Sequence, residues 1–345
     1  AVGGAALTKE EARVSIYGVP DKPGTSASIF AQIADRNVTV DMIVQNLGRD
    51  GKADISFTVP KNELEVTMDA VKESVANFGP VKITSDEQVS KVSAVGLGMA
   101  TQTGVADKMF RALAEGGVNL LMITTSEIKI SALVTRDQAS SALVAVHNAF
   151  DLHVAPADAA ENKTSYNVPR NVQDAAEILN RLGGVDMEEL FLDGITLDET
   201  QALMTINGVP DRPGIAADVF EEIAAANIFV DMIVQAQGVD GAANLGMTIP
   251  RDQLDAAVQV TEKLSGKLDA GSVISNPNIA KLSVSGIGLR SHTGVAVRMF
   301  KALAEAGINV EMINTSEVRV NVVVDGSEGK NALKCLEAAF ANVLR

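Results

Sequence analysis

Two nearly identical turns contain groups that could bind a free α-amino acid. GVPDKPG spans residues 18–24 and GVPDRPG spans residues 208–214, and each turn leads into a helix-like segment. Backbone N–H groups at a helix N-terminus favour a carboxylate. Asp21 and Asp211 stand shortly before each Pro-Gly and supply an anion for an ammonium group. The two turns therefore predict two amino-acid pockets.

An amide lies close to each turn in the expected fold. Gln45 and Gln235 end the strand-like segment that follows each helix, and an amide both donates and accepts hydrogen bonds. Each residue alone also has a purely structural interpretation. An Asp in a Pro-Gly turn often only shapes the turn, and a Gln at a strand end is usually solvated. The repeated combination of turn, acid and amide favours binding sites over these alternatives.

Catalytic chemistry is not predicted in this chain. GLGMATQTG (96–104) and GIGLRSHTG (286–294) are rich in Gly, but they lack the dinucleotide spacing and a Walker Lys. Ser291 and His292 are adjacent in one loop, so they cannot adopt the geometry of a catalytic triad. Thr101 and Gln102 occupy the equivalent positions in the first half.

The composition excludes several other functions. The net charge is −15, which disfavours nucleic-acid binding because phosphate contacts need a basic surface. One Cys and three scattered His residues predict no disulfide and no metal site. No apolar run is long enough to cross a bilayer and no secretory signal is present. We expect a cytosolic chain without membrane contact. Because it begins with Ala1 rather than Met, we expect a processed chain or a fragment.

The chain repeats at two levels. Residues 14–46 and 204–236 share 18 identities in 33 positions, and residues 91–127 and 281–317 share 21 in 37, at the same offset. A weaker repeat runs inside each half, with Gly, Phe, Ala and Met in register. The four Phe residues of this register are Phe30, Phe110, Phe220 and Phe300. The pattern predicts four modules of one type, each burying its Phe between helix and sheet.

The first module shows the expected order of elements. Residues 13–19 alternate like a strand, residues 25–37 have helical periodicity with Thr25 or Ser26 as possible caps, and two strands, a second helix and a closing strand follow. This order is βαββαβ, the ferredoxin-like arrangement. Module 2 lacks a clear closing strand. We predict that residues 1–7 supply it, and that residues 190–196 do so for module 4.

The predicted fold class is therefore α+β, with four ferredoxin-like modules arranged as two tandem pairs. The boundaries that we predict are 1–88 for module 1, 89–157 for module 2, 191–278 for module 3 and 279–345 for module 4. Residues 158–190 form a linker with a loop at 161–170 and a helix at 171–184. Because such a sheet has free edges, we also expect a homo-oligomer.

The segments 18–46, 91–134 and 288–324 resemble the tandem ACT regulatory region of aspartate kinase, here doubled to four ACT modules. The resemblance covers nearly the whole chain except the linker. It implies regulation, by lysine or threonine or both, of an enzyme that uses ATP to phosphorylate L-aspartate to 4-phospho-L-aspartate. The Lys-Phe-Gly-Gly-type loop of the catalytic domain is absent. The chain is then a fragment or a separate subunit, with the kinase domain in cis or in trans.

The resemblance also implies site residues. In such kinases each pocket is closed by a strand entry from a neighbouring module. The implied first pocket contains Asp21, Gly24, Thr25, Ser26, Ala27 and Gln45, closed by Asn119 and Leu120. The implied second pocket contains Asp211, Gly214, Ile215, Ala216, Ala217 and Gln235, closed by Asn309 and Val310. Second-tier or interface residues would be Ser126, Glu127, Ser316 and Glu317. The first pocket is the more polar one because Thr25-Ser26 stands where the second has Ile215-Ala216.

No cofactor is expected in this region, because ATP and Mg²⁺ would bind the absent kinase domain. The alternative function is a stand-alone ACT-type amino-acid sensor or scaffold subunit that partners another enzyme. Sequence upstream of Ala1 would separate the two.

Overall fold

The computed structural model describes residues 2–47, 51–96, 99, 104–126, 128–154, 191–238, 241–287, 293–316 and 318–344. The helix predicted for the linker lies outside these residues. So do residues 48–50, 127, 239–240 and 317, and the Gly-rich segments that contain Thr101, Gln102, Ser291 and His292.

The elements follow the order βαββα four times, and in modules 1 and 3 the predicted closing strand comes next. The first half contains β1 (Val2–Pro20), α1 (Thr25–Ala34), β2 (Ile43–Leu47), β3 (Lys52–Pro60), α2 (Leu64–Ser74), β4 (Lys82–Gly96), α3 (Val105–Glu115), β5 (Met122–Ser126), β6 (Lys129–Thr135) and α4 (Ala139–Ala149). The second half contains β7 (Phe191–Asp198), β8 (Gln201–Pro210), α6 (Ile215–Ala225), β9 (Ile233–Gln237), β10 (Ala242–Pro250), α7 (Leu254–Leu268), β11 (Val273–Asn276), β12 (Ile279–Ile287), α8 (Thr293–Glu305), β13 (Met312–Thr315), β14 (Arg319–Asp325) and α9 (Gly329–Phe340).

The described strands form one sheet in the order β11-β8-β10-β9-β5-β6-β4-β1-β3-β2-β13-β14-β12-β7, and adjacent strands are antiparallel. The strand that module 2 lacks comes from the N-terminal part of β1, where Leu7 pairs with Val92 on β4. For module 4 it comes from β7, which pairs with β12. The α+β class with four ferredoxin-like modules is confirmed.

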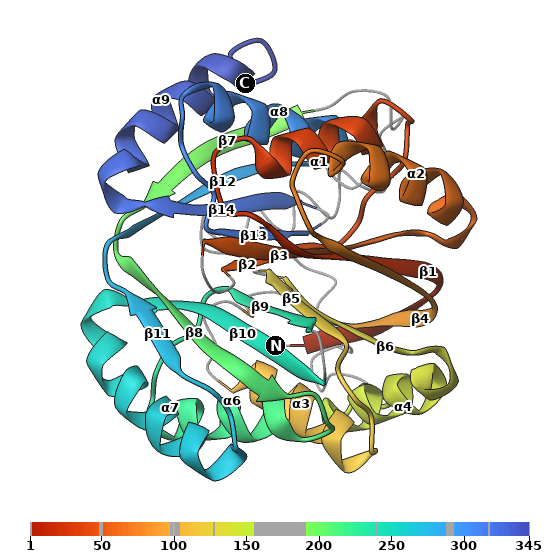
Figure 1. The fold of residues 1–345 in the computed structure, drawn as a ribbon. Helices are drawn as coiled ribbons and strands as arrows, with labels where there is room; N and C mark the ends of the chain where they lie inside the picture. Colours follow the sequence, from red (N-terminus) through yellow and green to blue (C-terminus); the bar gives the residue numbers. More distant parts are fainter. Residues whose placement is uncertain are drawn as a thin grey trace, which may run out of the picture.

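The helices lie in two layers on opposite sides of the strands (Figure 1). One layer contains α1, α2, α8 and α9, and the other contains α3, α4, α6 and α7. Each layer covers its own apolar core, one built by modules 1 and 4 and the other by modules 2 and 3. A third apolar cluster lies between them and includes Met42, Val44, Met122, Val234 and Met312.

The four repeated Phe side chains are buried, as predicted. Phe30 contacts Phe300 with ring centroids 5.7 Å apart, and Phe110 contacts Phe220 at 5.4 Å. These contacts join α1 to α8 and α3 to α6. Side-by-side packing therefore occurs between modules 1 and 4 and between modules 2 and 3.

This packing crosses the two tandem halves because tandem neighbours share long strands. In β1, the N-terminal Leu7 packs on the core of modules 2 and 3, whereas Val14 and Ile16 belong to the core of modules 1 and 4. The pairing of β1 with β4 is irregular between Thr8 and Arg13, but the register is the same on both sides, with Leu7 opposite Val92 and Val14 opposite Ser85. Successive side chains of a strand point to opposite faces, and Leu7 and Val14 are an odd number of residues apart, so they face opposite sides. Modules 1 and 2 thus place their helices on opposite sides.

Gly246 on β10 makes the middle of the molecule sensitive to one added methyl group. A Cβ at Gly246 would lie 2.6 Å from both Asn46 Oδ1 and Met312 Cε. We expect Gly246→Ala to destabilise the fold by about 1–3 kcal/mol through overpacking. Gly4→Ala is the control, since a Cβ there meets nothing within 4 Å. The midpoints of urea unfolding measure the stability of the two variants. Equal midpoints for Gly246→Ala and Gly4→Ala would contradict the packing described for β2, β10 and β13.

Candidate functional site

The turn before α1 forms one side of a cleft that we name the Asp21 cleft. Gly24 ends this turn with φ 91°, in the left-handed region that favours glycine. The N–H groups of the first helical turn have no acceptor inside the helix. The hydroxyls of Thr25 and Ser26 do not cap the helix. Thr25 Oγ1 instead donates to Pro20 O at 2.7 Å, and Ser26 Oγ donates to Gln45 Oε1 at 2.6 Å.

Module 4 forms the opposite side of the Asp21 cleft. Asn309 Nδ2 donates to Asp21 Oδ1 at 2.8 Å, and Gln45 Nε2 donates to Val310 O at 2.5 Å. Strands β2 and β13 pair next to these contacts, with Ile313 opposite Gln45. The two sides lie close together and leave a cavity of about 10 Å³ between them. An acid from one module thus faces an amide from another.

The Asp211 cleft repeats this geometry between modules 3 and 2. Asn119 Nδ2 donates to Asp211 Oδ1 at 2.8 Å, and Gln235 Nε2 donates to Leu120 O at 3.3 Å. Gly214 has φ 96° before α6. Strand β9 pairs with β5, with Ile123 opposite Gln235. The cavity between the two sides is about 10 Å³ here as well.

The structure corrects the predicted closure of the two pockets. Asn119 and Leu120 close the Asp211 cleft, not the Asp21 cleft. Asn309 and Val310 close the Asp21 cleft. The reason is that modules 1 and 2 lie on opposite helical layers, so the strand entry of module 2 cannot reach the turn of module 1. The two halves carry the same motifs, so no signal in the repeat distinguishes the two pairings.

The other predicted residues lie as follows. Gly24, Thr25, Ser26 and Ala27 line the Asp21 cleft, and Gly214, Ile215, Ala216 and Ala217 line the Asp211 cleft. Ser126 Oγ donates to Lys129 O at 3.3 Å, and Ser316 Oγ donates to Arg319 O at 3.4 Å, so both belong to hairpins. Glu127 and Glu317 lie outside the described residues. Phe300 and Phe110 also line the clefts, although the sequence indicates only a core role for them.

The two clefts differ in how their Gln is held. Gln45 is fixed at both ends of its amide, by Ser26 and by Val310 O. At the position of Ser26 the Asp211 cleft has Ala216, which has no hydroxyl to donate to Gln235. Ile215 replaces Thr25 and makes that turn more apolar. The Asp21 cleft is therefore the more polar of the two and has the more rigidly held amide.

Burial raises the pKa of the Asp21 carboxyl above its ordinary value, and the hydrogen bond from Asn309 partly opposes this rise. An ammonium ligand needs the ionised carboxylate. As the pH falls through the raised pKa, protonation removes that anion, so we expect amino-acid affinity of the Asp21 cleft to fall at a pH above the usual Asp range.

Titration calorimetry over a pH series, with L-lysine and L-threonine as probes, measures this dependence. Asp21→Asn is the control because its amide cannot ionise, so the affinity of its Asp21 cleft should not change with pH over the same range. Wild-type affinity that stays constant down to the ordinary Asp pKa would contradict the prediction.

Neither a membrane span nor a metal cluster is found in the described part of the chain. No described helix combines the length and the hydrophobicity needed to cross a membrane. No group of three His, Cys, Asp or Glu side chains gathers among the described residues.

Comparison with known proteins identifies the modules as ACT domains. The ACT domain model matches residues 14–75, 92–150, 205–263 and 282–340. The crystal structure of aspartate kinase from Synechocystis superposes with a TM-score of 0.83 and 33% identity, covering 99% of this chain and 56% of that one.

Two curated relatives match about half of the chain. The aspartokinase of Helicobacter pylori (strain ATCC 700392 / 26695) is 46% identical over 151 residues, 44% of this chain and 37% of the relative. The aspartate kinase of Stutzerimonas stutzeri (strain A1501) is 42% identical over 154 residues, 45% of this chain and 37% of the relative. The chain therefore spans little more than a third of the length of these relatives. With four matched domains, it belongs to the ACT domain family and is homologous to the aspartate kinases.

Proposed function

We propose that this chain is the amino-acid-binding regulatory region of an aspartate kinase, and that lysine, threonine or both bind in the Asp21 and Asp211 clefts. The observation that carries the proposal is the Asp–Asn hydrogen bond that crosses a module boundary in both halves, beside a helix N-terminus. An α-amino acid fits these groups, with its carboxylate on the N–H groups of the first helical turn and its ammonium on the Asp.

Such a ligand would bridge two modules. Asp21 and Asn309 come from different modules, so a ligand held by both stabilises one relative position of α1 and β13. A ligand shifts an equilibrium only through different affinities for the two states. The proposed switch is therefore a change in how modules 1 and 4, and modules 2 and 3, pack against each other.

The regulated partner would be a kinase domain in the same or in a separate chain. It would bind ATP and Mg²⁺, use L-aspartate and be inhibited by the end-product amino acids of feedback control. The cytosol is the compartment that fits this role, and we also propose self-association through the ACT modules. Support comes from the homology to aspartate kinases, of which this chain spans only part.

Calorimetric titration of the chain with L-lysine and L-threonine, separately and together, tests the proposal. We expect saturable binding of at least one of them. The methyl ester of the binding amino acid is the matched control, because it keeps the ammonium and side chain but loses the carboxylate, and it should bind far more weakly. Absence of binding of both amino acids at millimolar concentration, or equal binding of the ester, would overturn the proposal.

A further inference from the structure

The strands that form the floors of the two clefts contact each other through the middle of the molecule. Strand β2 contacts β9 and β10, and β13 contacts β5 and β9. Gln45 and Gln235 face their clefts. Successive side chains of a strand point to opposite faces, so Val44 and Val234 face the central apolar cluster, where they are buried together. Strands β2 and β13 of the Asp21 cleft therefore pack against strands β9 and β5 of the Asp211 cleft.

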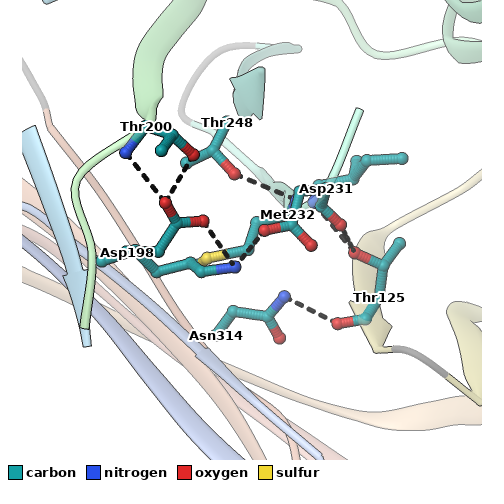
Figure 2. Close-up of polar contacts among 9 residues, drawn as sticks. Thr125, Asp198, Thr200, Asp231, Met232, Thr248 and Asn314 are labelled. Atoms are coloured by element: carbon teal, nitrogen blue, oxygen red, sulfur yellow. Dashed lines mark hydrogen bonds and ion pairs between the residues drawn. The ribbon is translucent and has the colours of Figure 1, made fainter. Parts of the chain in front are cut away.

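Two buried asparagines form hydrogen bonds between these two sets of strands. Asn46 Nδ2 donates to Val234 O at 3.3 Å and to Asn244 O at 3.0 Å. Asn314 Nδ2 donates to Thr125 O at 2.8 Å, as Figure 2 shows. Both side chains are buried, Asn46 at 4% and Asn314 at 0% exposure. Each hydrogen bond runs from a strand of the Asp21 cleft to a strand of the Asp211 cleft.

The contacts lie next to the residues that line the clefts. Asn46 follows Gln45, and its acceptor Val234 precedes Gln235. Thr125 also accepts a hydrogen bond at Oγ1 from Ile233 N at 2.9 Å, on the strand of Gln235. A shift of β2 or β13 therefore acts directly on β9 and β5.

Both asparagines break the internal symmetry of the chain. The position equivalent to Asn46 is Ala236, and the position equivalent to Asn314 is Thr124, each 190 residues away. Moreover, Asn46 Oδ1 and Asn314 Oδ1 are buried without a hydrogen-bond partner. Buried polar atoms rarely remain unpaired, and the other copy shows that an Ala or a Thr fits at these positions. Packing alone does not account for the two amides.

We propose that Asn46 and Asn314 couple the two clefts, so that a change in one cleft alters the affinity and local stability of the other. This inference deepens the proposed function, and it rests on it only for the ligand part of the test below. Coupling between sites in proteins typically amounts to about 5- to 150-fold, and it needs two elements that move together, here the pairs β2–β13 and β5–β9.

The first test needs no ligand. Gln45→Ala removes the donor to Val310 O, and all the side-chain hydrogen bonds that it removes directly belong to the Asp21 cleft. Hydrogen exchange measured by mass spectrometry should then show at least about fivefold faster exchange in β5 and β9 of the Asp211 cleft. In a variant that also carries Asn46→Ala and Asn314→Thr, Gln45→Ala should change the exchange rates of β5 and β9 by less than about twofold. These substitutions use the residues of the equivalent positions, which favours folding.

Asn207→Ala is the matched control, because Asn207 is a buried amide that donates within module 3, to Ser272 Oγ at 3.3 Å. In that background Gln45→Ala should keep its full effect on β5 and β9. Unchanged exchange in β5 and β9 after Gln45→Ala, or equal propagation in the double-asparagine background, would overturn the inference. The single variants Asn46→Ala and Asn314→Thr decide the same question if the double variant does not fold.

The second test uses L-lysine and L-threonine as probes. The affinity of the wild-type chain for one of them should change at least about fivefold when the other is saturating, and the double-asparagine variant should lose this change. If neither amino acid binds, the proposed function fails while the exchange experiment still decides the coupling. If both bind with equal coupling in wild type and variant, the proposed function stands and this inference fails.

Discussion

Asp21→Ala and Asp211→Ala should each weaken amino-acid binding to its own cleft by about 10- to 150-fold, roughly 1.5–3 kcal/mol. Each change removes a charge-assisted hydrogen bond to the ligand ammonium. It also frees the Asn309 or Asn119 amide, which donates to that carboxylate in the structure. Calorimetry with L-lysine and L-threonine measures both affinities.

Folding should change little in these variants. The turn is held by backbone hydrogen bonds, Asp21 N to Gly51 O and Asp211 N to Gly241 O, both 2.9 Å, which Ala retains. Asp35→Ala is the control, since Asp35 is an exposed acid at the far end of α1. If these Asp residues only shape the turn, the outcome reverses: the variants lose thermal stability and bind as tightly as wild type.

Lys91→Met should destabilise the fold by about 3–5 kcal/mol. Lys91 is 2% exposed and forms ion pairs with Asp41, 7% exposed, and with Glu11, 4% exposed, the latter at 3.8 Å. Removing the cation leaves the two carboxylates buried without its positive charge. This costs more stability than replacing a whole buried ion pair by apolar side chains. Asp41 O also accepts a hydrogen bond from Thr315 Oγ1 at 2.9 Å. The ion pairs therefore join modules 1 and 2 at the place where module 4 also contacts them.

The second half provides the matched control. Lys281 pairs with Asp231 and with Asp198, and these side chains are 14%, 20% and 32% exposed. Figure 2 shows where the two acids lie. Solvent screens this network better, so Lys281→Met should cost clearly less than Lys91→Met. Denaturant unfolding of both variants measures the difference. Equal losses in the two variants would mean that burial does not set the strength of these pairs.

The sequence predicts the modules well because each module is local. The register of Phe30 and Phe110 identifies the core, and alternation in residues 13–19 identifies a strand. It also indicates the N-terminal residues as a strand, because module 2 would otherwise leave an edge open. These inferences need only periodicity and the internal repeat, which local packing dictates.

Contacts between modules are less visible in the sequence. Both halves carry the same acid and the same Asn, so the repeat cannot say that Asp21 meets Asn309 rather than Asn119. That choice depends on which face of the long shared strand β1 each module covers, since Leu7 and Val14 belong to different cores. Asn46 and Asn314 are replaced by Ala236 and Thr124 in the other copy, but many positions differ between the copies, so a difference alone does not predict a contact. The Lys91–Asp41 pair did have a signal, since both charges recur 190 residues later within apolar segments.

A crystal structure of this chain with bound L-lysine or L-threonine is the most direct measurement of the central claim. It should place the ligand carboxylate at the first-turn N–H groups of α1 or α6, and the ammonium within hydrogen-bond distance of Asp21 or Asp211. The Asn of the facing module should contact the same ligand. Ligand bound elsewhere, with both Asp–Asn hydrogen bonds intact and both clefts empty, would contradict the account.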